Sequence, residues 1–177
     1  MDGGLEPHLP HVYRLALRLT RNVNCAEDLT QETFLRACQR IDQVKHPAAI
    51  RTWLFRIAFN LMNDQFRTMA PANESNHAAT DALSCHRPTP DKVAETNDDL
   101  AQALQRLDAL PTQQRLVLFL VTVEQLSLAE VCEVLGITMT NAKAQLSLAR
   151  KRMRDELQRQ TVSQSNSISI SVKSDRP

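Results

Sequence analysis

The stretch LGITMTNAKAQLSLARKRMRDEL, residues 135–157, decides how the second half of the chain folds. Gly136 interrupts an apolar run, and glycine is the residue that most often ends a helix in the left-handed conformation. The pattern after it is helical without a break and carries five cationic side chains from Lys143 to Arg154 before the next acidic residue, Asp155. We therefore predict a sharp turn followed by a long helix with a positive flank.

The residues just before this stretch predict a second, shorter helix. Ser127 and Glu130 stand three positions apart at the start of the apolar run LAEVCEVL, which is the spacing of a capping box. Thr138 is placed to cap the helix after the glycine. The side chains that would pack the two helices together are Val131, Leu135, Ile137, Ala142 and Leu146. This is a helix-turn-helix pattern, whose second helix usually enters a DNA major groove, although any hairpin of two helices has the same pattern.

The second block of the chain, which we place at residues 98–160, contains two more expected helices. The first is short and amphipathic, with apolar residues at Leu100, Ala103, Leu104 and Leu107. After Leu110-Pro111, the run RLVLFLVTV is apolar on all sides, which is typical of a buried helix. Beyond the block, residues 161–177 are serine-rich, and we predict that they are disordered.

The first block, residues 1–67, shows three amphipathic helices. Apolar residues recur at helical spacing at Leu9, Val12, Ala16, Leu19 and Val23, and again at Leu29, Thr33, Phe34, Ala37 and Ile41. Asn24 followed by Glu27 predicts the cap of the second helix. After a break at His46-Pro47, the third helix has its apolar stripe at Ile50, Trp53, Leu54, Ile57, Ala58 and Leu61. Phe55 and Phe59 fall on other faces, where both packing and DNA contact remain open.

The charge distribution separates the two blocks. Residues 70–99 carry two Lys/Arg against six Asp/Glu, whereas residues 1–69 carry nine against seven and residues 100–177 carry ten against seven. Residues 68–97 have no periodicity and contain three prolines, so we interpret them as a flexible acidic linker. The predicted fold is therefore all-α, with two small helical domains joined by this linker. The basic flanks are compatible with binding of a polyanion and equally with two solvated helical faces.

Several protein classes find no support in the sequence. No apolar stretch approaches the roughly 20 residues of a membrane span, so we expect no membrane insertion. The start MDGGLEPHLPHVYR lacks the basic flank and apolar core of a signal peptide. The cysteines at 25, 38 and 132 fall within helical patterns without C-x-x-C spacing, which indicates reduced core thiols in a cytosol. The adjacent Cys85-His86 pair is no zinc site by itself, because structural zinc needs four ligands.

Four segments together resemble the extracytoplasmic-function sigma factors, the smallest bacterial sigma subunits of RNA polymerase. They are AEDLTQETFLRA (26–37), WLFRIAFNLMNDQFR (53–67), LDALPTQQRLVLFLVTVEQLSLAEVCEVLGI (107–137) and LARKRMRDEL (148–157). The resemblance covers roughly residues 8–67 and 98–158. It implies that the first block is a sigma region 2, which binds the polymerase and opens the −10 element. It implies that the second block is a region 4, which reads the −35 element.

The resemblance also implies roles for particular residues. Asp28, Gln31 and Glu32 match the family's motif for binding core polymerase. Arg56, Asn60 and Arg67 match positions on the helix that binds the −10 element, where cations beside aromatic rings suit single-stranded DNA. The residues expected at the −35 element are Asn141, Lys143, Gln145, Arg150, Lys151 and Arg154.

The start of the recognition helix departs from the family pattern. A Thr-Val-Lys-Ser-Arg type sequence is usual there, whereas this chain has Asn141, Ala142, Lys143, Ala144 and Gln145. Glutamine pairs with adenine where arginine pairs with guanine. We expect Lys143 and the later cations to hold phosphates, and Gln145 to read a divergent −35 element or to read it weakly.

The function predicted from the sequence is that of a sigma factor that directs core RNA polymerase to specific promoters. Its expected partners are core polymerase, promoter DNA and the anti-sigma factor that the family usually has, with no cofactor or metal, in the cytoplasm. An alternative is a helix-turn-helix regulator that binds DNA without polymerase, which would need a dimer surface or an effector pocket. An enzyme with Cys85-His86 as a nucleophile pair has no supporting motif.

Overall fold

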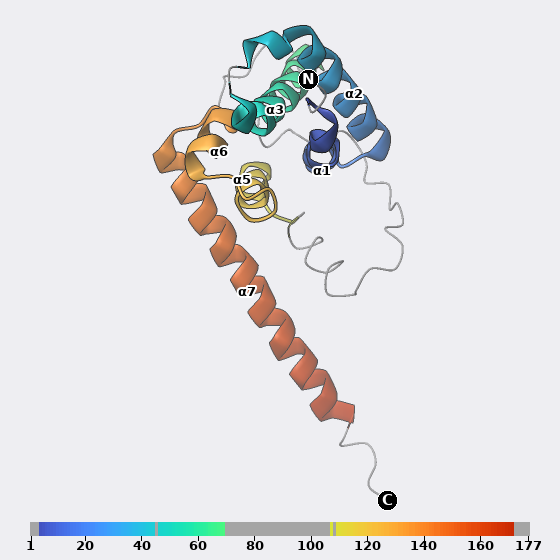
Figure 1. Cartoon of the computed structure of the whole chain (residues 1–177). Coiled ribbons are helices and arrows are strands. Elements are labelled where there is room, and N and C mark those ends of the chain that lie inside the picture. Colours follow the sequence, from blue (N-terminus) through green and yellow to red (C-terminus); the bar gives the residue numbers. More distant parts are fainter. Residues whose placement is uncertain (1–3, 45, 70–106, 108, 172–177) are drawn as a thin grey trace, which may run out of the picture.

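The computed structural model describes residues 4–44, 46–69, 107 and 109–171. Every regular element in these ranges is a helix, so the predicted all-α class is confirmed. Figure 1 shows a compact group of helices from which the last helix extends away. The linker at 68–97 lies almost wholly outside the described residues, as do the short helix expected from Leu100 and the Cys85-His86 pair.

The first helical unit has three long helices and three single turns of 3-10 helix, one before the first long helix and two between the second and the third. These are α1 (Leu9–Thr20), α2 (Val23–Arg40) and α3 (Ile50–Met69), with 3-10 turns at Glu6–His8, Ile41–Gln43 and Pro47–Ala49. Each long helix contacts the other two. Their shared core includes Val12, Leu15, Ala16, Leu19, Leu29, Leu54 and Ala58, all at most 1% exposed.

The junction between α1 and α2 differs from the sequence prediction. Arg21 adopts a left-handed conformation with φ 54°, and its N–H bonds to the Leu17 carbonyl, which ends α1. The cap of α2 is Asn22, whose side-chain oxygen accepts a hydrogen bond from the Cys25 N–H at 3.1 Å. The predicted pair of Asn24 and Glu27 is therefore wrong. The capping residue comes two positions earlier because the left-handed turn already reverses the chain there.

Helix α3 buries a much wider arc than the predicted stripe. Phe55 is 0% exposed and Phe59 is 5% exposed, although both fell outside that stripe. Trp53 and Ile57, which were expected in the core, are only half-buried. The physical reason is that α3 contacts α1 and α2 within its own unit and also α6 (Leu128–Leu135) of the second unit. In this structure both phenylalanines belong to the packing.

The second helical unit contains the predicted helix-turn-helix. It consists of α5 (Thr112–Thr122), α6 and α7 (Met139–Ser171). The capping box of Ser127 and Glu130 is present, and Gly136 caps α6 with φ 64°. The Asn141 N–H bonds to the Thr138 hydroxyl at 3.3 Å, as expected for the cap of α7. Val131 and Ala142, both 0% exposed, lie in the core between the two helices.

Helix α7 continues further than the composition indicated. It runs to Ser171, through eleven residues of the segment 161–177 that was expected to be disordered. The segment 161–171 contains neither glycine nor proline, the two residues that most strongly stop a helix.

Candidate polymerase and DNA interfaces

The outer face of α2 carries the residues that match the polymerase-binding motif. Asp28 and Gln31 are exposed, and Glu32 is half-buried. The Arg36 guanidinium donates to the Glu32 carboxylate at 2.8 Å, four positions away on the same helix. Leu35, at 60% exposure, lies among these polar side chains by its helical spacing. The face therefore offers carboxylates, an amide and one apolar side chain to a partner.

Helix α3 leaves one polar stripe uncovered. Arg56 and Asn60 are exposed and stand four positions apart, so they share a face. The backbone of Arg67 continues the same helix, but its side chain is outside what the structure describes. Most of the remaining arc of α3 packs against other helices, so this stripe is the surface of the helix that we consider for a ligand.

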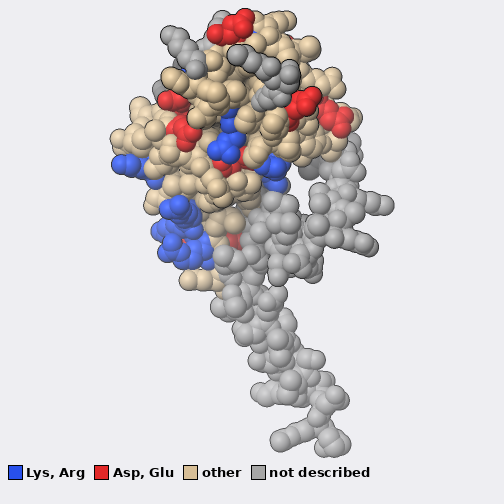
Figure 2. Space-filling model, viewed as in Figure 1, with Lys and Arg blue, Asp and Glu red and all other residues tan. Residues whose placement is uncertain are grey.

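Helix α7 presents a straight row of cations. Lys143, Arg150 and Arg154 are exposed, and spacings of seven and four residues place them on one side of the helix. Lys151 is also exposed, about a quarter turn further round. Figure 2 shows Lys and Arg side chains gathered along the visible part of α7. This row supplies the positive flank that the sequence predicted.

A second side of α7, about a quarter turn from the cationic row, is anchored to the rest of the unit. Ala142 and Ala149 are 0% exposed and Leu146 is 7% exposed, facing α5 and α6. Arg152 donates to the Gln114 side-chain oxygen at 2.9 Å, which ties the middle of α7 to α5. This anchoring holds the exposed face of α7 at a defined angle.

Asn141 and Gln145 lie on the edge of the buried side that is away from the cationic row. Both are half-buried, and the Gln145 amide donates to the Asn141 side-chain oxygen at 3.1 Å. By helical geometry Gln145 points roughly 160° away from Lys143 around the helix axis. The bond to Asn141 uses one of the two N–H donors of the Gln145 amide and holds the side chain on this edge.

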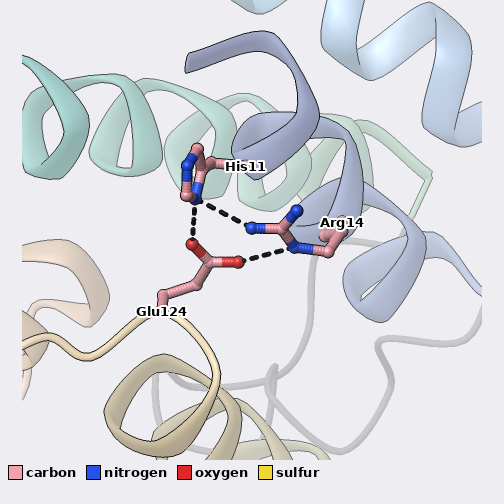
Figure 3. A network of polar contacts seen from close by, with 3 residues as sticks. All are labelled: His11, Arg14 and Glu124. Carbon is pink, nitrogen blue, oxygen red and sulfur yellow. Dashed lines mark hydrogen bonds and ion pairs between the residues drawn. The ribbon is translucent and has the colours of Figure 1, made fainter. Parts of the chain in front are cut away.

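A polar cluster joins the two helical units. Glu124, in the turn after α5, has a fully buried side chain, and its carboxylate points toward α1 (Figure 3). His11 Nδ1 lies 2.6 Å from one carboxylate oxygen, and Arg14 Nε donates to the other at 3.0 Å. A buried carboxylate requires such partners, because removing the charge from water is costly. We call His11, Arg14 and Glu124 the inter-unit clamp.

His11 Nδ1 lies between the two other members of the clamp. It is 2.6 Å from a Glu124 carboxylate oxygen, which is an acceptor, and 2.8 Å from Arg14 Nη2, which is a donor. Nearby, burial lowers the pKa of His8, and the charges of His11 and Arg51 lower it further.

A second polar contact joins α3 to α6. The Thr52 hydroxyl donates to Glu130 Oε1 at 3.2 Å, while Glu130 Oε2 accepts from the Ser127 N–H and hydroxyl. The hydrogen bonds from Ser127 are the main reason why the pKa of Glu130 lies below its usual value of 4.5. One carboxylate therefore both caps the helix-turn-helix and holds it to the first unit.

Comparison with known protein families identifies both helical units. Residues 5–70 match the model for sigma-70 region 2, and residues 100–153 match the model for sigma-70 region 4. The ECF RNA polymerase sigma factor SigW of Bacillus subtilis is 32% identical over 154 residues, which cover 82% of this chain and 82% of SigW. The chain belongs to the extracytoplasmic-function family of RNA polymerase sigma factors.

Further relatives agree with this membership. SigE of Mycolicibacterium smegmatis is 32% identical over 157 residues, which cover 88% of this sigma factor but 61% of SigE. The chain thus spans about three fifths of the length of that relative. Among solved structures, a sigma factor RpoE from Bartonella quintana, in complex with the anti-sigma factor NepR, aligns with a TM-score of 0.65 at 22% identity. That alignment covers 87% of this chain and 94% of RpoE, and supports the fold.

Other observations concern what the described residues lack. None of the described helices combines the length and the apolar character that crossing a bilayer requires. Within the described ranges, no group of three or more His, Cys, Asp or Glu side chains is arranged to hold a metal ion. The three described cysteines are free thiols, and Cys38 is exposed, so the expectation that all three lie in the core is wrong.

The inter-unit clamp was missed by reasoning from the sequence. Its one local signal is Glu124, a carboxylate placed directly after the apolar run RLVLFLVTV. A charge at the end of a buried helix ordinarily points to solvent, and the partners on α1 are more than 100 positions away, with sequence separations of 113 and 110. No local pattern connects residues at that distance.

We expect the Glu130 contacts to weaken in acid. The folded-state pKa lies below 4.5, so the charged carboxylate adds stability above that pH, and the contribution is lost as the pH falls through the folded value. Glu130→Gln keeps the cap geometry without the charge. The difference in thermal melting temperature between the sigma factor and this variant should therefore shrink as the pH is lowered below 4.5. A difference that is independent of pH would contradict this assignment.

Proposed function

We propose that this sigma factor binds core RNA polymerase through the outer face of α2 and directs it to promoters. The observation that carries the proposal is the exposure of three polar surfaces on helices whose other sides are core. They are the Asp28–Gln31 face of α2, the Arg56–Asn60 stripe of α3 and the cationic row of α7. In the order of the chain these surfaces serve polymerase, the −10 element and the −35 element.

The decisive experiment is transcription with and without core polymerase. The full chain and core enzyme together should give run-off products from a subset of a genomic promoter library, and neither component should do so separately. A stand-alone helix-turn-helix regulator is the second candidate. It predicts tight, specific DNA binding by the free chain and no complex with core polymerase in a pull-down.

The α3 stripe is assigned to promoter opening. Arg56 supplies a charge for phosphates, and Asn60 supplies an amide for a base edge or the backbone. The buried aromatic rings Phe55 and Phe59 support the shape of the helix in this structure, so the polar stripe has to provide the DNA contacts. Arg67 extends the stripe by its position in the sequence.

Asn60→Ala should reduce promoter opening more than it reduces polymerase binding. Asn60 is exposed, so its loss leaves the core of the first unit intact. The measurement is the permanganate reactivity of thymines in the −10 region, with Gln65→Ala as a control at another exposed position of α3. Normal thymine reactivity in the Asn60 variant would remove this residue from the −10 site.

The closed arrangement of the two units has a consequence for promoter binding. The −10 and −35 elements lie about 25 base pairs apart, or roughly 85 Å of duplex at about 3.4 Å per step. A compact body of about 120 residues has a radius of gyration of only about 14 Å. The inter-unit clamp and the Thr52–Glu130 bond must therefore open when both elements are bound. The 37 residues from 70 to 106 can reach about 120 Å at full extension, which is sufficient.

The remaining parts of the proposal follow from family membership. The sigma factor acts in the cytoplasm, where its polymerase lies, and carries out no catalysis of its own. RpoE and CnrH, two structural neighbours, are each described in complex with a second protein, which for RpoE is an anti-sigma factor. We propose that an anti-sigma factor also restrains this chain. Co-purification from the native host with a tagged sigma factor tests this.

A further inference from the structure

The DNA-facing side of α7 has an apolar centre. In the described part of the chain, five large hydrophobic side chains are substantially exposed, and two of them lie on α7: Met139 at 40% and Leu148 at 45%. Thr140, Ala144 and Ser147 are also exposed on this helix. A cationic helix that shows apolar and small side chains needs an explanation in terms of what covers it.

Helical geometry places Thr140, Ala144, Ser147 and Leu148 opposite the core, whereas Met139 lies on the side of the cations. At about 100° per residue, the direction opposite the buried Ala142–Leu146 side falls close to Ala144. Leu148 lies about 40° from Ala144 on one side, and Ser147 about 60° from it on the other. The cations Lys143, Arg150 and Arg154 follow one flank of this face, and the bonded pair of Asn141 and Gln145 follows the other. A helix in the major groove directs its central face to the bases and its flanks to the two backbones.

The major groove has one apolar feature, the C5-methyl group of thymine, and alanine or the methyl of threonine are typical partners for it. We propose that Ala144 and Leu148 recognise the −35 element through thymine methyl groups, in place of hydrogen bonds from arginine or glutamine. This inference rests on the proposed function, because it requires α7 to lie in the groove. The flanking cations indicate DNA as the occupant, since they complement a polyanion along the whole exposed length of the row.

The proposal gives Gln145 a different role from the one expected from the sequence. Its side chain already bonds to Asn141, and both side chains are half-buried on the flank. In our assignment, Asn141 and Gln145 both face a DNA backbone. Gln145→Ala should then leave the preferred −35 sequence unchanged, whereas Leu148→Ala should relax it.

The test uses the sigma factor assembled with core RNA polymerase. Preferred −35 sequences are first selected from duplexes randomised at that element, and we expect thymine to be enriched. Each thymine of the selected element is then replaced by deoxyuridine, which removes only the methyl group. Because burial of one methyl group is worth about 0.8 kcal/mol, we expect affinity to fall about threefold to fourfold for each contacted thymine.

Protein variants make the test specific to the named side chains. Leu148→Ala should lose the discrimination between thymine and deoxyuridine duplexes at the position that Leu148 contacts, because that methyl group has then lost its partner, and should keep it at a thymine contacted by Ala144. Gln145→Ala, the matched control on the flank, should discriminate between the two duplexes as the unchanged sigma factor does. Selection of elements without thymine would overturn the proposal, as would equal binding of the two duplexes by the unchanged sigma factor. Loss of discrimination in Gln145→Ala alone would instead identify Gln145 as the reader.

A parallel salt titration separates this inference from the proposed function. Lys143→Ala should flatten the salt dependence of −35 binding by about one counterion. If it does so while deoxyuridine has no effect, α7 lies on DNA and only the methyl recognition is wrong. If neither change has an effect, α7 is not the DNA-binding helix, and its apolar face serves a protein partner.

Discussion

Arg14→Ala should separate the two helical units, whereas Glu124→Met should leave them in contact. Removing Arg14 leaves the buried Glu124 carboxylate with His11 as its one remaining partner in the clamp, and opening the interface lets water reach the charge. Breaking a buried ion pair from one side costs about 3–5 kcal/mol. Because Arg14 is itself 42% exposed, we expect the lower end of that range. That is roughly a hundredfold change in the ratio of closed to open molecules.

Glu124→Met removes the same contact, but we expect it to leave the two units closed. Methionine has a similar length and brings no charge that needs a partner, and replacing a buried ion pair by an apolar residue is often neutral or stabilising. His11 and Arg14 are both partly exposed and can remain hydrated. The closed arrangement should therefore persist without the clamp, held by the packing of α3 against α6.

The distance between the units is the quantity to measure. Fluorescence energy transfer between dyes at Asn24→Cys and Glu133→Cys, two exposed positions, reports it in a background without other cysteines. Arg14→Ala should lower the transfer efficiency at unchanged helical circular dichroism, and Glu124→Met should not lower it. The Arg14 variant should also assemble with core polymerase faster, because opening precedes promoter binding. Equal transfer in all three proteins would mean that the clamp does not control the closed state.

Truncation of Gln31 and Glu32 together should strongly weaken the binding of core polymerase. The two side chains share the exposed face of α2 with Asp28, and a hydrogen bond to a charged group is worth about 1.5–3 kcal/mol. Loss of both contacts should therefore reduce affinity at least tenfold, in the range of interface hot spots. Helical circular dichroism of the free chain should stay the same, because neither side chain belongs to the core.

Competition against labelled sigma factor for core polymerase measures this effect. Glu6→Ala is a suitable control, because it removes an exposed carboxylate from the same unit at a distance from α2 along the chain. Glu32 could contact the polymerase directly or as part of its ion pair with Arg36, which donates to that carboxylate in the free chain. Arg36→Ala distinguishes these two roles. If Arg36→Ala weakens binding as much as the double truncation does, the polymerase recognises the ion pair. Unaltered affinity of the double variant would refute the docking face.

Much of this sigma factor can be predicted from short stretches of its sequence. The capping box of Ser127 and Glu130, the turn at Gly136 and the cap at Thr138 all form between residues at most four positions apart. Such contacts depend on local backbone chemistry, so the spacing of the side chains determines them. The same holds for the exposed faces of α2, α3 and α7, because helical periodicity decides which residues share a face.

Tertiary structure alone decided what covers those helices. Phe55 and Phe59 are buried on a helix that contacts α6 as well as α1 and α2, and periodicity within α3 carries no information about a helix about 70 positions away. The partial burial of Asn141 and Gln145 depends on how α5 and α6 pack against α7, although the bond between the two side chains is a local contact four residues apart. Glu124 is buried because His11 and Arg14, at separations of 113 and 110 residues, meet it across the two units. The free energy of a buried charge depends on partners in space, and only the folded chain brings those partners together.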